Sequence, residues 1–368
     1  MKSLREPLNG VSASFFHGLY GREKDTVRIL NIDGLYLVPA FRRLGAEVLT
    51  LGSAPGCEVF LERPLSLKGL TDLLTSRGFT PDLVFWADVC RPPSVVGFEN
   101  FPAVTLGYSI DSYCNPWHIP YGAAFDAMFA AQKDYVRFFD DAPITRPTAW
   151  LPLFADPDTD QDLGLDRDIP VSFVGTVTGS INTARKAFLA RFKRRCPLFV
   201  LTGDYGSVFG RSRLVLNQSA AGELNFRVFQ AMACGAALLT EDTGNGLNDL
   251  FTPGQDLLVY PRDDDRAAAA LAHQALEPEN AAALAEMAVR GRDQVRAKHG
   301  ADQRAAQVLA MARRLAAEGA PRRRLAALDL IRPMLANASF ILASDEALPL
   351  PPDHRAFYAE LGRLYLLA

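Results

Sequence analysis

The sequence predicts an α/β protein built from two tandem domains, each with a mostly parallel sheet covered by helices, and a helical C-terminal tail. Three observations lead to this prediction. Short apolar runs alternate with helical patterns over most of the chain, which is typical of parallel strands joined by helices. The alternation stops once, in a stretch rich in Pro and Asp between residues 144 and 169, and then resumes. A chain of 368 residues is long enough for two such domains.

The first domain is expected to occupy residues 1–150. Its strands are predicted from apolar runs at 26–33, 47–51, 81–88 and 102–111. Its helices are predicted where apolar residues recur at helical spacing, over 35–46, 67–78 and 124–139. Gly45 and Gly78 are expected to end the first two helices, because Gly adopts the left-handed conformation at little cost.

The second domain is expected over residues 169–318, after a linker at 151–168, and the tail over 319–368. Its strands are predicted at 171–177, 198–203, 213–218, 236–240 and 256–260, and its helices at 183–195, 225–235 and within the Ala-rich stretch 266–318. In the tail, a helix that begins at Pro321 has an apolar stripe formed by Leu325, Leu328, Ile331 and Leu335. The stripe favours packing on the body of the protein, and a docking surface for a partner, such as a second copy, is the alternative.

Composition and charge narrow the class of protein. The 39 basic and 42 acidic residues give a net charge of −3, which argues against a nucleic-acid-binding protein. The five cysteines are dispersed without a C-x-x-C pair, which favours reduced thiols over a disulfide framework or a zinc site. The start of the chain lacks the apolar core of a signal peptide, and no run reaches the about 18 apolar residues of a membrane span. We therefore expect a cytoplasmic protein without a metal site, in which the acidic runs 156–160 and 263–265 are solvated turns or a helix cap.

The segment 220–251 indicates an anion-binding site. A helix is predicted from its N-cap at Asn225 to Gly235, and the free backbone N–H groups at a helix start bind anions. Arg227 lies in the first turn, where a cation is disfavoured beside the positive helix end. A bound diphosphate would remove this conflict and would give the guanidinium a bidentate partner. The alternative is a solvated ion pair between Arg227 and Glu223, which is worth little.

The same segment resembles a known family. The letters NQSAAGELNFRVFQAMACGAALLTEDTGNGLNDLFTPGQDLLVY, residues 217–260, are similar to the nucleotide-binding half of GT-B-fold glycosyltransferases. Within that fold they look most like the CgeB-like branch, called after a spore-maturation protein. The resemblance extends from about Pro81 to Arg314 and is strongest from Leu214 to Tyr260. It implies the GT-B fold, in which two tandem Rossmann-like domains face a cleft, and transfer of a sugar from a nucleotide diphosphate.

The resemblance also implies roles for individual residues. The backbone of the loop after the first strand of the second domain approaches the phosphates, and the helix start with its Arg holds the diphosphate. One position on that helix faces the ribose, the loop at 240–245 lines the sugar end of the cleft, and the loop at 203–205 holds the base. In this chain the implied donor-binding set is Gly175, Thr176, Gly203, Asp204, Tyr205, Asn225, Arg227, Gln230, Thr240, Glu241, Gly244 and Asn245.

The chain departs from the family pattern at the ribose position. The family usually has Glu there, and this chain has Gln230; Glu223 is also one residue out of step with the acid that precedes it in many GT-B enzymes. A hydrogen bond to a carboxylate is worth roughly 1.5–3 kcal/mol, against about 0.5–1.5 kcal/mol for one to a neutral amide. The substitution therefore implies weakened nucleotide binding, a changed donor or a degenerate enzyme.

Glycosyl transfer requires that the leaving nucleotide be stabilised as negative charge builds on it and that the acceptor hydroxyl be held in line. The resemblance implies that the helix start and a basic side chain do the first task without a metal. An inverting enzyme also needs a base in the first domain, for which the candidates are Asp111, His118 and His17, in that order. A loop polar group or a core His explains each of them as well, and a retaining enzyme needs no such base.

The sequence thus predicts a metal-independent glycosyltransferase with no covalently bound cofactor, which takes a nucleotide-sugar co-substrate, a UDP-sugar being favoured. The acceptor hydroxyl belongs to a glycan, a protein or a small molecule, with no nucleic acid or membrane span involved. A nucleotide-sugar epimerase and a catalytically degenerate GT-B scaffold or binding protein are the alternatives. A dehydrogenase is disfavoured because no G-x-G-x-x-G follows a strand.

Overall fold

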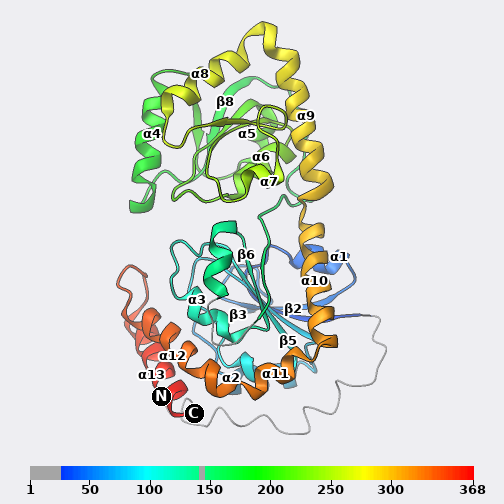
Figure 1. Ribbon diagram of the computed structural model, residues 1–368, viewed down its shortest axis with the longest axis vertical. Helices are drawn as coiled ribbons and strands as arrows, with labels where there is room; N and C mark the ends of the chain where they lie inside the picture. Colours follow the sequence, from blue (N-terminus) through cyan, green and yellow to red (C-terminus); the bar gives the residue numbers. More distant parts are fainter. Residues whose placement is uncertain (1–25, 141–145) are drawn as a thin grey trace. The chain divides into compact units, whose positions relative to one another are not determined.

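The computed structural model describes residues 26–140 and 146–368, which form two compact units. The N-terminal unit contains the described residues up to Leu151 together with Ala305–Ala368, and the C-terminal unit is Pro152–Arg304. Each unit has one parallel sheet with helices packed on it (Figure 1). The expected domain boundary at residue 318 differs from this division, because residues 305–318 and the tail cluster with the N-terminal sheet.

The N-terminal sheet has seven parallel strands in the order β3-β2-β1-β4-β5-β6-β7. β4 and β5 are buried along their whole length, as expected for parallel strands covered on both faces. The order of the strands reverses between β1 and β4, so the loops that follow these two strands diverge there. The strands are β1 (Arg28–Asp33), β2 (Glu47–Gly52), β3 (Val59–Phe60), β4 (Leu83–Ala87), β5 (Val104–Ser109), β6 (Ala127–Ala130) and β7 (Thr148–Trp150).

The helix predicted over 124–139 is wrong. Residues Ala127–Ala130 form β6, which pairs with β5, and Lys133–Phe139 form a 3-10 helix, η5. All four residues of β6 are buried, and a short run that is apolar throughout fits a buried strand as well as a buried helix. The expected seam at 144–169 also contains an edge strand, because β7 pairs with β6.

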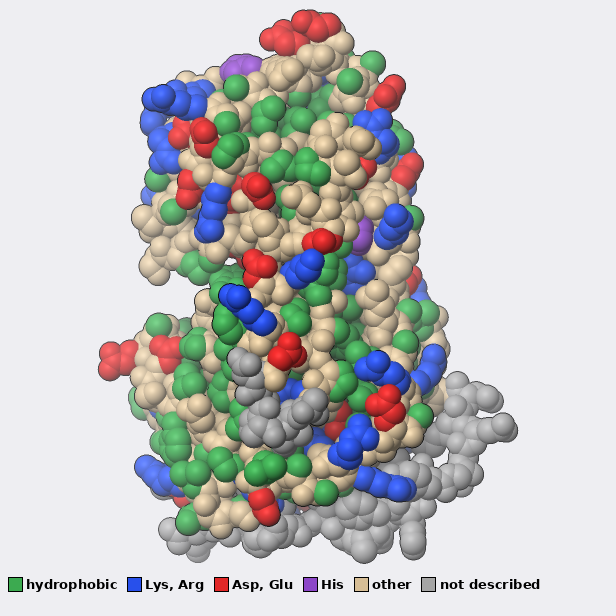
Figure 2. Space-filling view, in the orientation of Figure 1, with side chains coloured by type: hydrophobic (Ala, Val, Ile, Leu, Met, Phe, Trp, Pro, Cys, Tyr) green, Lys and Arg blue, Asp and Glu red, His purple; other side chains and the backbone are tan. Residues whose placement is uncertain are grey.

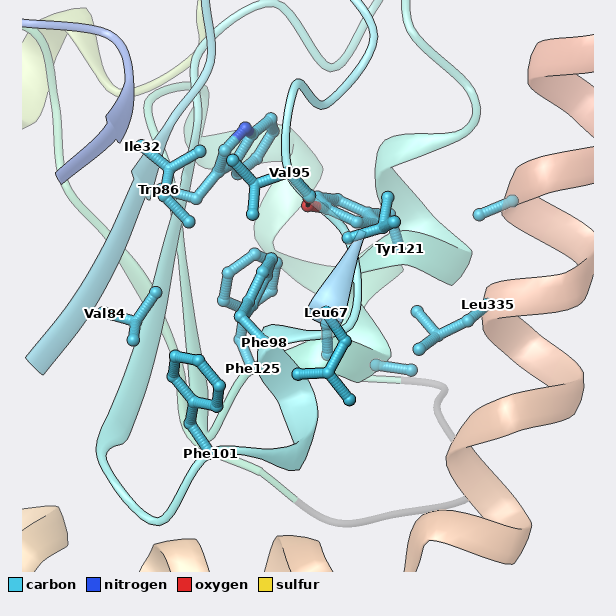
Figure 3. Packing of buried hydrophobic residues seen from close by; sticks show 14 of the residues in the cluster. Ile32, Leu67, Val84, Trp86, Val95, Phe98, Phe101, Tyr121, Phe125 and Leu335 are labelled. Carbon is cyan, nitrogen blue, oxygen red and sulfur yellow. Dashed lines mark hydrogen bonds between the residues drawn. The ribbon is translucent and has the colours of Figure 1, made fainter. Parts of the chain in front are cut away.

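The helices of the N-terminal unit include the whole tail. They are α1 (Val38–Arg43), α2 (Leu67–Ser76), η3 (Phe98–Asn100), α3 (His118–Tyr121), η4 (Gly122–Ala124), α11 (Ala320–Ala326), α12 (Leu328–Ser344) and α13 (Pro352–Leu367). Leu335 of α12 joins the core around Trp86, Phe98 and Tyr121 (Figure 3). Ile331 is buried in the same cluster, which confirms that the apolar stripe packs on the body of the protein.

The single tail helix expected from Pro321 is two helices, α11 and α12, with an angle of 78° between them. Arg324 explains this, because it is buried in α11 and its guanidinium donates to the carbonyl oxygens of Glu99, Phe101 and Ala103 and to the carboxylate of Asp126. Within the described ranges, no individual helix has the length and hydropathy to cross a membrane, and only the bent pair α11–α12 meets that test jointly.

The C-terminal sheet has five parallel strands in the order β12-β11-β10-β8-β9. Its strands are β8 (Ile169–Val174), β9 (Phe199–Leu201), β10 (Ser212–Asn217), β11 (Ala237–Glu241) and β12 (Leu258–Tyr260). Its helices are η6 (Ser180–Asn182), α4 (Thr183–Lys193), α5 (Gly206–Arg211), α6 (Phe226–Ala233), α7 (Leu247–Leu250), α8 (Asp265–Leu276), η7 (Pro278–Asn280), α9 (Ala281–Lys298) and the start of α10 (Ala301–Ala317). Gly235 follows α6 with a positive φ of 79°, as its predicted role at the helix end requires.

Candidate functional site

The candidate site lies at the carboxyl ends of β8 and β10 in the C-terminal unit. β8 lies between β9 and β10, so the connection after β8 runs to one side of the sheet and the connection after β10 to the other. Open α/β sheets bind ligands in the crevice that opens where strand order reverses in this way. The residues next to this switch point are therefore the ones from which the site is built.

Arg227 is fixed at the switch point by backbone and side-chain oxygens. Its Nε donates to the carbonyl of Val174 at 2.8 Å, and its Nη1 donates to Asn217 Oδ1 at 2.7 Å. The guanidinium lies 4.3 Å from the ring centroid of Phe173. Its other nitrogen, Nη2, makes no hydrogen bond within residues 26–140 and 146–368, and it lies so close to Gly175 that a Cβ there would be 2.2 Å away. Arg227 thus keeps one donor for a ligand beside the backbone of the β8 loop.

The alternative ion pair between Arg227 and Glu223 is not formed. Glu223 accepts hydrogen bonds from the backbone N–H groups of Ala220 and Ala221 at 3.0 and 2.7 Å, and it lies 3.6 Å from Nη2 of Arg185. This carboxylate therefore shapes the loop after β10. Helix α6 begins at Phe226, after Glu223, so Glu223 and Arg227 do not lie on one helix face.

Arg185 is a second buried cation at the site that the sequence analysis missed. It lies on α4 and donates to the carbonyl of Thr176 at 3.1 Å and to Gln218 Oε1 at 3.2 Å. Its side chain is only 8% exposed, whereas the basic residues at the far end of α4 (Lys193, Arg194 and Arg195) are exposed. Figure 2 shows such Lys and Arg side chains gathered over the end of α4. No local pattern separates Arg185 from these neighbours, because all of them lie in one basic segment over residues 185–195.

The charge of the site is positive at neutral pH. Burial, and after it the nearby positive charge of Arg185, lower the pKa of Arg227 to about 9. Even with this shift the guanidinium is protonated at pH 7. The buried guanidinium of Arg185 and the half-buried one of Arg227 face one carboxylate, that of Glu223, which lies 3.6 Å from Arg185. An anionic ligand would therefore relieve the cost of keeping the second cation out of water.

The loop at 240–245, which the family resemblance implies lines the sugar end of the cleft, begins with two residues that point into the protein. Thr240 is buried and its Oγ1 accepts from Asn217 Nδ2 at 2.9 Å, so Asn217 links Thr240 to Arg227. Glu241 is also buried, and one carboxylate oxygen accepts from the backbone N–H and the hydroxyl of Ser219. Burial raises the pKa of Glu241, against the opposing effect of these hydrogen bonds. Its role in this structure is to hold the loop after β10.

The remaining part of the loop turns sharply. Gly244 and Asn245 both have positive φ, at 61° and 45°, and the N–H of Gly244 donates to Asp242 Oδ1 at 3.0 Å. Asn tolerates the left-handed region better than most residues, which accounts for its presence at that position. At the start of α6, Asn225 occupies the predicted N-cap with an extended backbone, but its side chain makes no capping hydrogen bond. Asn225 Oδ1 is buried and has no partner among the residues that the structure describes.

The structure brings together the implied ribose and base positions. Gln230 Nε2 donates to the hydroxyl oxygen of Tyr205 at 2.9 Å, and that hydroxyl donates to Asp160 Oδ1 at 2.7 Å. Asp160 is buried, and burial raises its pKa, so the expectation of solvated turns over 156–160 is wrong at this residue. Gly203 has a φ of 125°, and Asp204 is exposed and accepts from the N–H of Gly206 at 3.1 Å.

The candidate bases of the first domain lie around a different residue, Asp88. The N–H of Asp111 donates to Asp88 Oδ2 at 2.7 Å, and Asp111 Oδ1 accepts from the hydroxyl of Tyr113 at 2.9 Å. His118 Nδ1 is 2.8 Å from Ser109 Oγ, and its Nε2 is 3.6 Å from Asp88 Oδ1. The third candidate, His17, lies outside the described residues.

His118 is a neutral core histidine. It is fully buried, and its ring packs edge-on against Trp86 and Trp117 at centroid distances of 5.2 and 4.2 Å. Burial lowers its pKa to about 3. A base in this position cannot contact solvent or a ligand without rearrangement of the core. Asp111 is half-buried and remains the more accessible of the two.

Among residues 26–140 and 146–368, no group of three or more His, Cys, Asp or Glu side chains is arranged to hold a metal ion.

Comparison with known proteins agrees with this geometry. Residues 168–310 match the family described as "Glycosyl transferase-like" (Glyco_trans_1_2). No curated protein matches the chain. The match covers the C-terminal sheet and its helices, including Arg185 and Arg227.

Similar solved structures span both units. Sucrose-phosphate synthase (tll1590) from Thermosynechococcus elongatus is 13% identical with a TM-score of 0.58, covering 80% of this chain and 100% of that one. A glycosyltransferase from Rickettsia africae ESF-5 is 10% identical with a TM-score of 0.57, covering 79% and 99%. Anabaena Alr3699/HepE in complex with UDP-glucose is 14% identical with a TM-score of 0.56, covering 78% and 99%.

At these identities the similarity defines the fold. The chain has the GT-B fold, with two parallel-sheet Rossmann-like domains and C-terminal helices, as the sequence predicted. Its C-terminal domain is glycosyltransferase-like in sequence. The narrower resemblance to the CgeB-like branch stays a prediction.

Proposed function

We propose that this chain is a glycosyltransferase that moves a sugar from a nucleotide diphosphate, with a UDP-sugar favoured, to an acceptor hydroxyl. The observation on which the proposal rests is the geometry of Arg227, whose Nη2 has no protein partner in the described ranges and lies against Gly175 at the switch point of the sheet. The glycosyltransferase-like match over residues 168–310 supports the same assignment. The neighbour HepE was solved with UDP and with UDP-glucose, which makes UDP the first donor to test.

In the proposed reaction the acceptor hydroxyl releases its proton, to solvent in the net reaction, and its oxygen forms a bond to the anomeric carbon while the bond from that carbon to the diphosphate oxygen breaks. Negative charge accumulates on the leaving diphosphate, and a preorganised cation stabilises it most where water is excluded. Arg227 supplies that charge through Nη2, and Arg185 orients the backbone carbonyl of Thr176 and adds a second positive charge. Metal-independent transfer is part of this proposal, because the two guanidinium groups provide positive charge at the diphosphate.

The first test is calorimetry of the full chain against UDP, GDP, TDP and ADP in the presence of a chelator. We expect one nucleotide to bind selectively and Arg227→Ala to weaken its binding by a factor of roughly 10 to 150, which corresponds to losing a charged hydrogen bond of about 1.5–3 kcal/mol. Arg211→Ala is the matched control, since Arg211 is an exposed arginine of the same unit that pairs with Asp168. Unchanged affinity in a folded Arg227→Ala variant would contradict the proposal.

A second variant tests the site without removing a charge. A methyl group at Gly175 would be 2.2 Å from Arg227 Nη2, so Gly175→Ala should displace the guanidinium and weaken nucleotide binding at least tenfold. Gly210→Ala is the control, because a Cβ at Gly210 would be 3.4 Å from Leu165 Cδ1, which is ordinary contact. Equal effects of the two substitutions would mean that the packing of Arg227 against Gly175 is unimportant for binding.

A nucleotide-binding protein without transfer activity is the second candidate. Two observations favour it: the side chain of Gln230 already donates a hydrogen bond to Tyr205, and the candidate base His118 is fully buried. Release of UDP from UDP-glucose, measured with and without a panel of acceptors, separates the two functions. Binding of UDP without any release would favour the second candidate, and acceptor-dependent release would favour transfer.

A further inference from the structure

Two cysteines that lie far apart in the sequence meet in the N-terminal unit. Cys90 follows β4 and Cys114 follows β5, and these strands are parallel neighbours in the sheet. Their sulfur atoms are 3.8 Å apart, which is van der Waals contact. All five cysteines look dispersed along the sequence, because the 23 residues between Cys90 and Cys114 conceal the proximity of this pair.

The surrounding hydrogen bonds hold both sulfurs in place. The side-chain amide of Asn115 lies 3.5 Å from Cys90 Sγ and 3.4 Å from Cys114 Sγ, and it donates to the carbonyl of Asp111 at 3.0 Å. Asp88 accepts from the N–H of Cys90 at 2.6 Å and from the N–H of Asp111 at 2.7 Å, so one buried carboxylate ties the two loops together. The contact between the sulfurs is thus a fixed feature of these loops.

We propose that Cys90 and Cys114 form a redox-modification site, a dithiol that closes reversibly into an intramolecular disulfide by exchange with a low-molecular-weight disulfide of the oxidised-glutathione class. The Cys90 thiolate attacks one sulfur of the small disulfide, and the first small thiolate leaves. Cys114 then loses its proton and attacks Cys90 Sγ, and the second small thiolate leaves. The two protein thiols lose two electrons and two protons, and the small disulfide is reduced to two thiols.

The environment of each sulfur fixes this order of events. Cys90 is exposed, whereas Cys114 is half-buried, so the external disulfide reaches Cys90 first. The hydrogen bond with Cys114 lowers the pKa of Cys90, and the Asn115 amide adds to this effect, while the same contact and burial raise the pKa of Cys114. Cys90 is therefore the attacking thiol, and Cys114 is the resolving one.

The disulfide would act on a cavity as well as on the loops. A disulfide bond is about 2.05 Å long, so the two sulfur atoms, now 3.8 Å apart, must approach each other by nearly 2 Å through rotation of the side chains or movement of the loops after β4 and β5. Cys90 also lines a cavity of about 480 Å³ together with Phe60, Arg91, Leu350 and His354. Oxidation would therefore change the shape of a cavity at the carboxyl edge of the N-terminal sheet.

The test uses the full chain equilibrated in mixtures of reduced and oxidised glutathione, followed by an acid quench, alkylation of the free thiols in denaturant, so that the buried Cys196 and Cys234 also react, and peptide mapping by mass spectrometry. We expect the number of alkylated thiols to fall from five to three, with Cys90 and Cys114 in one cross-linked peptide, and dithiothreitol to restore all five. Cys114→Ser should instead retain glutathione on Cys90, because the resolving thiol is absent.

Cys57→Ser is the matched control, since Cys57 is half-buried and should leave the cross-link unchanged. The thiol count and the peptide map of the parent chain alone support or overturn the proposal, so a variant that fails to fold does not affect the test. Five alkylated thiols after oxidation, a cross-link between other cysteines, or stable glutathione on Cys90 of the parent chain would each overturn the proposal.

Discussion

Replacing Gln230 by Glu should destabilise the protein in a pH-dependent way. The hydroxyl of Tyr205 has one proton, which it donates to Asp160 at 2.7 Å, and it accepts from the amide of Gln230 at 2.9 Å. A carboxylate at position 230 has no proton to donate, so it would face the Tyr205 oxygen without a hydrogen bond and lie close to a second carboxylate. At a separation of roughly 5 Å and an effective dielectric constant of about 20, two carboxylates repel by about 3 kcal/mol.

Because Gln230 is half-buried, solvent reduces this repulsion, and we expect Gln230→Glu to lose about 2 kcal/mol of unfolding free energy at pH 8. The repulsion raises the folded-state pKa of the pair above its unfolded value, so stability should recover as the pH falls through that raised pKa. Gln230→Ala is the control, since it loses about 1 kcal/mol for one neutral hydrogen bond at either pH.

Urea denaturation at pH 8 and pH 5, with calorimetry against UDP on the same samples, measures both effects. A Gln230→Glu variant with unchanged stability and tighter UDP binding would refute the reasoning. That result would show that the side chain at 230 is free to reach a ribose, as the family resemblance implies, and is not committed to Tyr205.

Two further substitutions test the N-terminal unit. Arg324→Met should cost about 3–5 kcal/mol of unfolding free energy, because it leaves the buried carboxylate of Asp126 unpaired, whereas Arg323→Ala at an exposed neighbouring position should cost less than about 0.5 kcal/mol. Similar denaturation midpoints for the two variants would mean that Arg324 does not anchor α11. His118→Gln should make the stability less sensitive to acid. In the parent chain, His118 lowers the free energy of unfolding by about 2 kcal/mol between pH 7.5 and pH 5. The reason is that His118 binds a proton in the unfolded chain but not in the folded one, where burial lowers its pKa to about 3. Parallel stability–pH profiles for parent and variant would exclude this account.

The sequence was sufficient for the fold because most strands are continuous apolar runs, which are typical of parallel sheets. Three strands of the N-terminal sheet were missed: β3 and β7 span only two and three residues, and Ala127–Ala130 of β6 are followed by residues that extend a helical pattern. The prediction of a single tail helix was wrong for a different reason. Its periodicity continues across Ala327, and only the contacts of Arg324 with Glu99 and Asp126, 225 and 198 residues earlier in the chain, reveal that α11 and α12 diverge. Such long-range contacts leave no local pattern in the sequence.

The candidate site could also be predicted only in part, because a local pattern marks some of its residues and long-range contacts place the others. Arg227 stands out because its place in a first helical turn conflicts with the helix dipole, which is a local property. Arg185 has the same surroundings as its basic neighbours in α4 until the fold places Thr176 and Gln218 around it. The Tyr205–Asp160 contact joins residues 45 apart and was equally hidden. A residue that conflicts with a local structural rule, such as Arg227, can therefore be recognised in the sequence. A residue whose role depends on distant segments that come together in the fold, such as Arg185, cannot.

The two switch points differ in charge, and this difference indicates different tasks. In the C-terminal unit, the buried Arg185 and the half-buried Arg227 lie beside a single carboxylate, so the edge is cationic and suited to a phosphate. In the N-terminal unit, burial raises the pKa of Asp33 and Asp88 to about 6, and both accept hydrogen bonds from the loops around them. These carboxyl groups hold the loops in place. Because they are acids, they add no positive charge that could attract a diphosphate. A donor nucleotide should therefore bind the C-terminal unit, and substitutions at Asp88 should alter loop structure without changing UDP affinity.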